Sequence, residues 1–392
     1  MADLSVKLGE LELKNPIMIA SSPLTARIDL LEQADENGAA AVCIKHTMLK
    51  QRFKAKPRWY YNPDIGVVVS GDPRLEPEVA AELVRQAKEK TSLKVIPNMS
   101  GSPGDAESWG TVAKMMEQAG ADAVELNFNC PNLLAADSKF SDQGSNLGGN
   151  PEGCAMVVKA VKNACRIPVI VKLSTESGRM PHVVSACLEA GADIPNIHAG
   201  YRAAPGIDIY NGGKFLYPGS PAGSFGGHTG VYSRMATNRF VADIARQHPN
   251  VPLIGGSGLV YWNHIIETIM FGAYAVQMCT EVIHRGFPIV KDCVLGLEKY
   301  MDEQGYKSFE DIRGISLQYI TKPGEMQYTE VAAKINPDRC VGCKQCTKIA
   351  HCVAIEYEKA EKKCYVNPEK CIGCGFCIGV CPKNAIGVQE KE

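Results

Sequence analysis

Short apolar runs recur along most of this 392-residue chain, and each is followed by a stretch with apolar residues at helical spacing. Eight such runs cover residues 17–20, 41–45, 94–98, 123–127, 169–173, 193–198, 253–256 and 275–279. The intervening stretches 78–90, 109–119 and 180–190 show the helical spacing most clearly. Eight alternations of strand and helix predict a parallel (β/α)8 TIM barrel, with a doubly wound open sheet as the alternative.

The barrel is favoured because no run is followed by a Gly-x-Gly-x-x-Gly turn that opens a helix. An open sheet of the nicotinamide-binding kind needs that turn to hold a pyrophosphate. We therefore predict a barrel over residues 1–308. The pattern is weaker over 309–330, which we interpret as a linker, and a small domain then covers 331–392.

Polar residues collect at the carboxyl ends of the predicted strands, where a barrel carries its reactive groups. In 124–132, Val124 and Leu126 suit a buried strand, and the run then changes to amides, the thiol of Cys130 and a proline. Amides such as Asn127 can fix a planar ligand, and a thiol can give or take a proton. A turn with a structural cysteine is the alternative. The other strand ends carry Ala20, Ser21, Lys45, Asn98, Lys172 and Asn196.

Two glycine clusters, 226–230 and 255–258, follow late in the chain, and Cys279-Thr280 follows the last strand. Loops after the last strands of a barrel often hold a phosphate on backbone N–H groups, although ordinary turns are the alternative. Flavin mononucleotide (FMN) fits this pattern, with a lysine near the pyrimidine edge of its ring. The candidate residues are Gly227, Thr229, Gly230, Gly255, Gly256, Cys279 and Thr280.

Nine of the 16 cysteines follow residue 339, at the spacing of metal ligands. Cys371, Cys374, Cys377 and Cys381-Pro382 form C-x2-C-x2-C-x3-C-P, which wraps a 4Fe-4S cluster while the fourth cysteine serves a neighbouring cluster. Zinc is the weaker alternative, because three thiolates would crowd one tight loop. The tail therefore predicts an α+β ferredoxin-like domain.

An earlier half-motif matches in only three ligands, because Ala350 stands where the later half has its fourth cysteine. Cross-ligation predicts one cluster on Cys340, Cys343, Cys346 and Cys381. The other cluster, on Cys371, Cys374 and Cys377, needs a fourth ligand. We favour Cys352 over Cys364 or a three-iron cluster. Cys352 lies two residues beyond the position of Ala350, and a distortion of the loop can absorb this extra length.

Composition and charge exclude several classes of protein. The chain is 45% hydrophobic and 22% charged, as globular proteins are, and its net charge of −1 favours neither nucleic acid nor an anionic membrane. The N-terminal residues lack the pattern of a signal peptide, and no apolar run is long enough to cross a bilayer. We expect a cytoplasmic protein.

With the barrel, the 127–132 stretch and the cysteine tail in place, the sequence resembles the dihydroorotate and dihydropyrimidine dehydrogenase superfamily. It is most similar to the catalytic subunits of bacterial two-subunit dihydropyrimidine dehydrogenases, which join an FMN barrel to a two-cluster ferredoxin domain. The resemblance implies that Cys130 is the acid/base thiol and that Asn127 and Asn196 hold substrate or flavin. It implies an FMN site lined by Ala20, Ser21, Lys45, Asn98, Lys172, the loop 226–230, Gly256 and Thr280.

The chain departs from the superfamily in two segments. Residues 69–77 lack both the Asn-x-Glu segment of pyrimidine-reducing members and the asparagine-rich segment of dihydroorotate enzymes. The loop after Cys130 also differs, running through Asp137, Lys139 and Asp142 to 146–150. The resemblance to the superfamily therefore implies the class of reaction more strongly than it implies the substrate.

The resulting hypothesis is an oxidoreductase that reduces or forms a polarised C=C bond in a pyrimidine such as uracil or thymine, or in a similar ring. FMN N5 would supply hydride and Cys130 the proton. A reductase of another cyclic or conjugated carbonyl compound, or an electron-transfer subunit, is the alternative. We expect an NAD(P)H-oxidising flavoprotein subunit or a ferredoxin-type donor as partner, in a homo- or hetero-oligomer.

Overall fold

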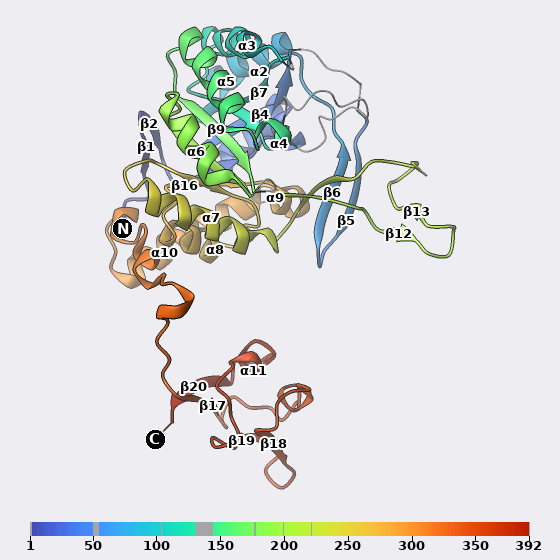
Figure 1. The fold of residues 1–392 in the computed structure, drawn as a ribbon, viewed down its shortest axis with the longest axis vertical. Helices are drawn as coiled ribbons and strands as arrows, with labels where there is room; N and C mark the ends of the chain where they lie inside the picture. The colour runs from blue at the N-terminus through green and yellow to red at the C-terminus, as the bar shows by residue number, and fades with distance from the viewer. Residues whose placement is uncertain are drawn as a thin grey trace. The chain divides into compact units, whose positions relative to one another are not determined.

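A computed structural model describes residues 2–49, 55–102, 104–130, 144–175, 178–198, 200–220 and 222–391. The chain divides into two compact units, Met1–Tyr319 and Ile320–Glu392. The first unit is an α/β barrel and the second is a small cysteine-rich domain (Figure 1).

The first unit is a closed barrel of eight parallel strands that neighbour one another in chain order. The strands are β3 (Ile17–Ile19), β4 (Ala41–Met48), β7 (Lys94–Ser100), β8 (Val124–Phe128), β9 (Val169–Ser174), β10 (Ile194–His198), β15 (Ile254–Gly256) and β16 (Ala275–Met278). Each coincides with one of the eight predicted runs. The predicted barrel is confirmed, and the open sheet is wrong because β16 pairs with β3.

Within the described residues, eight longer helices follow the barrel strands in turn. They are α1 (Ile28–Glu36), α2 (Pro77–Lys90), α3 (Ala106–Gln118), α5 (Pro151–Ala164), α6 (Met180–Glu189), α7 (Ser233–Gln247), α8 (Trp262–Met270) and α10 (Pro288–Gln304), with the short α4 (Gly144–Leu147) and α9 (Thr280–Arg285) between them. In α2, Pro77 occupies the first turn, and Ala80, Val84 and Ala87 form a buried stripe. In the part of the chain described, no helix has the length and apolar character of a membrane span.

A second, four-stranded sheet lies beyond the barrel strands, in the order β11-β14-β6-β5. Its strands are β5 (Arg58–Asn62), β6 (Gly66–Gly71), β11 (Tyr201–Ala203) and β14 (Gly226–Thr229), and a small hairpin of β12 (Ile207–Asp208) and β13 (Lys214–Phe215) follows β11. A Cβ on Gly66 would lie 2.2 Å from the carbonyl oxygen of Thr229, so only glycine allows β6 and β14 to approach there. The first glycine cluster is thereby fixed against β6. Another hairpin, of β1 (Val6–Leu8) and β2 (Leu11–Leu13), precedes the barrel.

The second unit pairs β17 (Val331–Ile335) with β20 (Ile386–Glu390), and β18 (Ile355–Glu358) with β19 (Lys363–Val366). With the short α11 (Phe376–Gly379), these strands give the predicted α+β ferredoxin-like domain. The predicted linker, 309–330, is shorter than expected on its N-terminal side. Phe309 and Ile312 are buried in the barrel core, and the division between the units falls after Tyr319.

Trp109 on α3 packs against Phe128 at the end of β8, with ring centroids 5.6 Å apart, and its side chain is 1% exposed. We predict that Trp109→Ala lowers the free energy of unfolding of the barrel by about 3–5 kcal/mol, because it leaves a large cavity. Urea denaturation followed by circular dichroism measures this. Tyr210→Ala is the control, since Tyr210 is 95% exposed and should change little. Equal effects of the two substitutions would contradict the described packing.

Candidate active site

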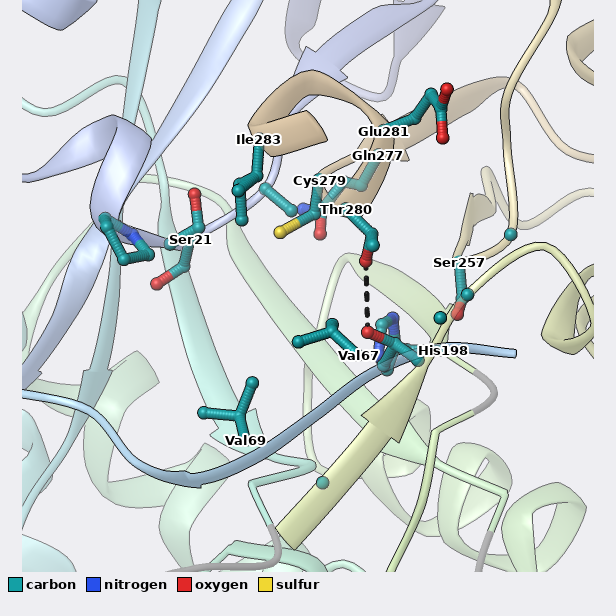
Figure 2. A pocket seen from close by; sticks show the side chains of 18 of the residues that line it. Ser21, Val67, Val69, His198, Ser257, Gln277, Cys279, Thr280, Glu281 and Ile283 are labelled. Carbon is teal, nitrogen blue, oxygen red and sulfur yellow. Dashed lines mark hydrogen bonds between the residues drawn. The ribbon is translucent and has the colours of Figure 1, made fainter. Parts of the chain in front are cut away.

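A cavity of about 750 Å³ opens at the carboxyl ends of the barrel strands. Its size is in the range of about 300–1,000 Å³ that ligand and cofactor sites occupy. Most of the predicted site residues line it: Ala20, Ser21, Lys45, Asn98, Asn127, Cys130, Lys172, Gly227, Thr229, Gly230, Cys279 and Thr280. Ser21 and Ser257 lie on opposite sides of the cavity, and Cys279 and Thr280 lie between them (Figure 2).

Three predicted site residues do not line this cavity. Asn196 is fully buried inside the barrel on β10. A Cβ on Gly255 would meet the Thr268 side chain at 2.4 Å, so this glycine serves the packing of β15 on α8. A Cβ on Gly256 would lie 3.5 Å from the side-chain oxygen of Asn196. The loop with Pro131, Asn132, Asp137, Lys139 and Asp142 lies outside the described residues.

A buried carboxylate, Glu125 on β8, is the centre of the polar network beneath the cavity. Its Oε1 accepts a hydrogen bond from Asn98 at 2.7 Å, and its Oε2 accepts from Asn196 and from Gln277, each at 2.6 Å. The Lys172 ammonium lies 3.7 Å from Oε1 and donates to Gln277 Oε1 at 2.7 Å. A fully buried carboxylate needs such partners to remain charged.

The same network reaches the loop that carries the candidate thiol. Asn127 Nδ2 donates to Asn98 Oδ1 at 2.9 Å. The Asn127 Oδ1 in turn accepts the backbone N–H of Asn129 at 3.1 Å and that of Cys130 at 2.9 Å. The side chain of Asn127 therefore fixes the backbone at Cys130 from below.

A second cluster of charges lies at the mouth of the cavity beside Cys130. The Asp72 carboxylate forms an ion pair with Lys45, and the Arg74 guanidinium lies 3.6 Å from it. Arg74 Nη2 donates to Cys130 Sγ at 3.2 Å. The three charged side chains are only 6–12% exposed. Burial, with the charge of Arg74 added, lowers the pKa of Lys45 to about 7, and Cys130 and Cys279 oppose this shift.

Backbone hydrogen bonds hold the segment that carries Asp72 and Arg74. Leu75 N–H donates to the carbonyl of His46 at 3.0 Å, and Met48 N–H donates to the carbonyl of Leu75 at 3.0 Å. The segment thus pairs with the last residues of β4, next to Lys45, through a parallel bridge between Thr47 and Leu75. Its charged side chains are held where they meet the thiol.

Two histidines near the cavity are kept neutral by their surroundings. Burial, together with the charge of Lys172, lowers the pKa of His198 to about 3. Burial, followed by the charge of Arg74, holds the pKa of His46 well below its usual value, and the His46 Nε2 lies 2.8 Å from Ser100 Oγ. Neither imidazole is protonated near neutral pH, so neither supplies an acidic proton.

The other end of the cavity offers hydroxyl and backbone groups. Thr229 Oγ1 and Thr280 Oγ1 are 3.1 Å apart, the contact drawn as a dashed line in Figure 2. A Cβ on Gly258 would meet the backbone nitrogen of Arg234 at 2.4 Å, so this loop lies against the first turn of α7. Ser257 has a φ of +92°, a backbone conformation that is uncommon for a residue with a side chain. Such a cradle fits a phosphate.

These features also fit the rest of FMN. Val67, Val69 and Ile283 give the cavity apolar walls suited to a flat ring system. Lys45 and Lys172 provide positive charge at the strand ends, where the polar edge of such a ring needs it. The polar groups at both ends of the cavity and its apolar walls therefore fit the flavin that the sequence predicts.

The cysteines of the second unit surround two small cavities. One is lined by Cys340, Cys343, Cys346 and Cys381, together with Cys364. The other is lined by Cys352, Cys371, Cys374 and Cys377. Each predicted cross-ligated set lines one of the cavities, and Cys364 is an additional cysteine at the first. No group of three or more His, Cys, Asp or Glu side chains among the described residues is arranged to hold a single metal ion. In each group the thiols line one hollow.

Backbone amides also point at the candidate ligands. Ala333 N–H donates to Cys371 Sγ at 3.4 Å, and Ala385 N–H donates to Cys381 Sγ at 3.3 Å. Such donors stabilise the negative charge of thiolates that hold iron. The residues present therefore fit 4Fe-4S clusters.

Four functional residues were missed from the sequence: Asp72, Arg74, Glu125 and Gln277. Glu125 and Gln277 could have been found, because each is a polar residue inside an otherwise apolar run. A polar residue within such a run either points away from the barrel interior or lies inside the barrel with a polar partner. Asp72 and Arg74 gave no such signal, because their position depends on how a connecting segment folds back onto β4.

The comparisons with known proteins agree with this geometry. A family model described as dihydroorotate dehydrogenase matches residues 3–301. The chain belongs to the dihydroorotate dehydrogenase family. A model of a 4Fe-4S binding domain matches residues 364–387, which contain Cys371, Cys374, Cys377 and Cys381. This member of the family is thus a flavin-dependent oxidoreductase with an iron-sulfur domain, and the resemblance inferred from the sequence is confirmed.

Its relatives include enzymes of two pyrimidine reactions. The NAD-dependent dihydropyrimidine dehydrogenase subunit PreA of Escherichia coli (strain K12) is 28% identical over 368 residues, covering 88% of this chain and 84% of the relative. The dihydroorotate dehydrogenase B (NAD(+)) catalytic subunit of Pyrococcus abyssi is 32% identical over 321 residues, covering 80% and 99%. A putative dihydroorotate dehydrogenase A (fumarate) of Aeropyrum pernix is 30% identical over 315 residues, covering 80% and 97%.

We predict that Glu125→Gln lowers the free energy of unfolding of the barrel by about 3–5 kcal/mol, because Lys172 would keep a buried charge without its counter-ion. Denaturant unfolding followed by circular dichroism measures the change. Glu82→Gln on α2 is the control, because the side chain of Glu82 is 55% exposed and its loss should hardly matter. A Glu125→Gln protein as stable as the parent would contradict the role given to the network.

Proposed function

We propose that the chain catalyses the reduction, or the formation, of a polarised C=C bond in a pyrimidine or a similar ring. The observation that carries this proposal is the position of Cys130. Its thiol lines the same cavity as the groups that fit a flavin, on a loop held by Asn127. A thiol over a flavin site suits a reaction that adds hydride and a proton to neighbouring carbons.

FMN, when bound, supplies or accepts hydride at N5. The chain's own residues orient the reactants around it. Thr229, Thr280 and the glycine loops would hold the phosphate, and Lys45 and Lys172 would stabilise negative charge on the ring. Asn98 and Asn127 are bonded to each other, so the second N–H of each amide and the second lone pair of Asn98 Oδ1 are fixed for a planar ligand.

Cys130 would hold the proton that is transferred to, or removed from, the carbon next to the hydride carbon. Burial lowers the pKa of both histidines that line the cavity, so neither is an imidazolium that would compete with Cys130 as the acid. Arg74 donates a hydrogen bond to the thiol sulfur and so fixes its direction.

Two ring substrates deserve separate consideration, a neutral pyrimidine and a carboxylate-bearing ring such as dihydroorotate. The relatives named above include proteins named for each reaction. The guanidinium of Arg74 beside Cys130 favours the carboxylate, because its fork of N–H groups binds carboxylates strongly. The chain lacks the substrate-recognition segments of both groups at 69–77, and Asp72 and Arg74 occupy that region.

Two 4Fe-4S clusters would complete the enzyme, one on Cys340, Cys343, Cys346 and Cys381 and one on Cys352, Cys371, Cys374 and Cys377. When bound, they carry electrons one at a time between the flavin and an external donor or acceptor. The two thiol-lined cavities support this assignment.

The electrons would be exchanged with a separate protein. The sequence has no Gly-x-Gly-x-x-Gly turn for a dinucleotide. The relatives from Escherichia coli and Pyrococcus abyssi are both named as subunits of NAD-dependent enzymes. We infer an NAD(P)H-oxidising flavoprotein subunit or a ferredoxin-type donor as partner.

We predict that Cys130→Ala keeps its flavin but loses about 10²- to 10⁴-fold in turnover, the usual effect of removing a positioned acid or base. Anoxic assays with an artificial electron donor and a panel of uracil, thymine and orotate measure this. Cys130→Ser should keep slight activity.

The matched control is Cys293→Ala, since Cys293 is a buried thiol on α10 away from the cavity. This variant should turn over like the parent. Normal turnover of Cys130→Ala with any substrate of the panel would refute the proton role of the thiol.

We predict that Arg74→Gln weakens the binding of a carboxylate-bearing ring by about 10- to 100-fold, the worth of a charged hydrogen bond, with little effect on a neutral pyrimidine. Arg74→Lys should lose less, because it keeps the charge. Ligand titrations of flavin absorbance give the two dissociation constants. An equal loss for orotate and uracil would show that Arg74 does not select a carboxylate.

A further inference from the structure

The two halves of the cysteine-rich unit are repeats offset by 31 residues, as Cys371 is from Cys340. The sequence Asn-Pro precedes the first cysteine of each half, at 336–337 and at 367–368. The same offset takes Ala333 on β17 to Cys364 on β19. One half thus carries a methyl group where the other carries a thiol.

Each of these positions lies on the strand that packs against a cysteine loop. In one half, Ala333 lines the cavity of Cys352, Cys371, Cys374 and Cys377. In the other, Cys364 lines the cavity of Cys340, Cys343, Cys346 and Cys381. The cavity beside Ala333 therefore has four thiols, and the cavity that includes Cys364 has five.

Two contacts, at the residues just before Cys364, hold its strand against the loop. A Cβ on Gly342 would lie 2.1 Å from the carbonyl oxygen of Lys362, and Gly342 has a φ of +65°, so glycine is required for this approach. Lys363 Nζ donates to the carbonyl of Cys340 at 2.6 Å. Cys364 is 2% exposed, and its thiol interacts with those of Cys346 and Cys340. No rearrangement of the strand is needed to bring this thiol to the cavity.

We propose that Cys364 is a reserve ligand of the cluster on Cys340, Cys343, Cys346 and Cys381, able to take the place of Cys346. The exchange needs no oxidant or reductant. The Cys364 thiol releases its proton to water as its sulfur binds iron, and the displaced Cys346 sulfur takes up a proton. The cluster of the other half has no such reserve, because alanine stands at the corresponding place.

The test compares matched substitutions in the two halves of the full-length chain, purified without oxygen. Cys346→Ala removes the ligand beside Cys364, and Cys377→Ala removes its repeat counterpart beside Ala333. Iron and sulfide per flavin, and electron paramagnetic resonance spectra for three-iron clusters, are the measurements. Flavin content reports that the barrel is folded.

We expect about eight iron atoms in the parent and in Cys346→Ala, since two four-iron clusters remain. Adding Cys364→Ala should then remove iron or give a three-iron spectrum. Cys377→Ala alone should show this loss, and adding Ala333→Cys should restore the iron. If the variant with both Cys346→Ala and Cys364→Ala folds poorly, the gain of iron on adding Ala333→Cys still decides the test.

Equal iron loss in Cys346→Ala and Cys377→Ala would overturn the reserve role, as would iron in Cys346→Ala that does not depend on Cys364. The inference rests on the proposed two clusters. A parent chain with only about four iron atoms would refute that assignment itself, so the two failures are distinguishable.

Discussion

The buried carboxylate of Glu125 is the constraint on which the candidate site depends. Removing a carboxylate from water is strongly unfavourable unless charge and hydrogen bonds replace the lost hydration. Here the replacement comes from four other strands: Asn98 on β7, Lys172 on β9, Asn196 on β10 and Gln277 on β16. Because side chains from four strands contact one carboxylate, the strands are held in one arrangement, and the floor of the cavity is preformed.

The chemistry at the mouth of the cavity follows from that arrangement. Asn127 extends the network to the backbone of Cys130, while Asp72 joins Lys45 and Arg74 above it. Charges that are this little exposed interact more strongly than charges in water. The result is a thiol held between a fixed amide below and a guanidinium at its sulfur, facing the space where a ring substrate would lie over a flavin.

The sequence predicted the scaffold well and the specificity poorly, for physical reasons. Strands of a barrel are buried on both faces, so their apolar runs and polar ends are visible, and both the strands and residues such as Lys45 were found. The alternation of apolar and polar residues does not distinguish a position inside the barrel from one at the mouth of the cavity. Asn196 was therefore predicted to line the site, although it lies inside the barrel. Asp72 and Arg74 lie on a connecting segment whose position is set by its hydrogen bonds to β4, an interaction that no local pattern encodes.

Anaerobic titration of the oxidised protein with dihydrouracil and dihydroorotate tests whether a flavin and a proton-carrying thiol act on one ring. This measurement needs no partner protein, because the electrons come from the substrate itself. The account predicts that one of the two compounds bleaches the flavin and then the iron-sulfur absorbance in the parent, and does so far more slowly in Cys130→Ala. Two results would contradict this expectation. In one, dithionite bleaches the parent flavin but neither compound does. In the other, the parent and Cys130→Ala are bleached at equal rates.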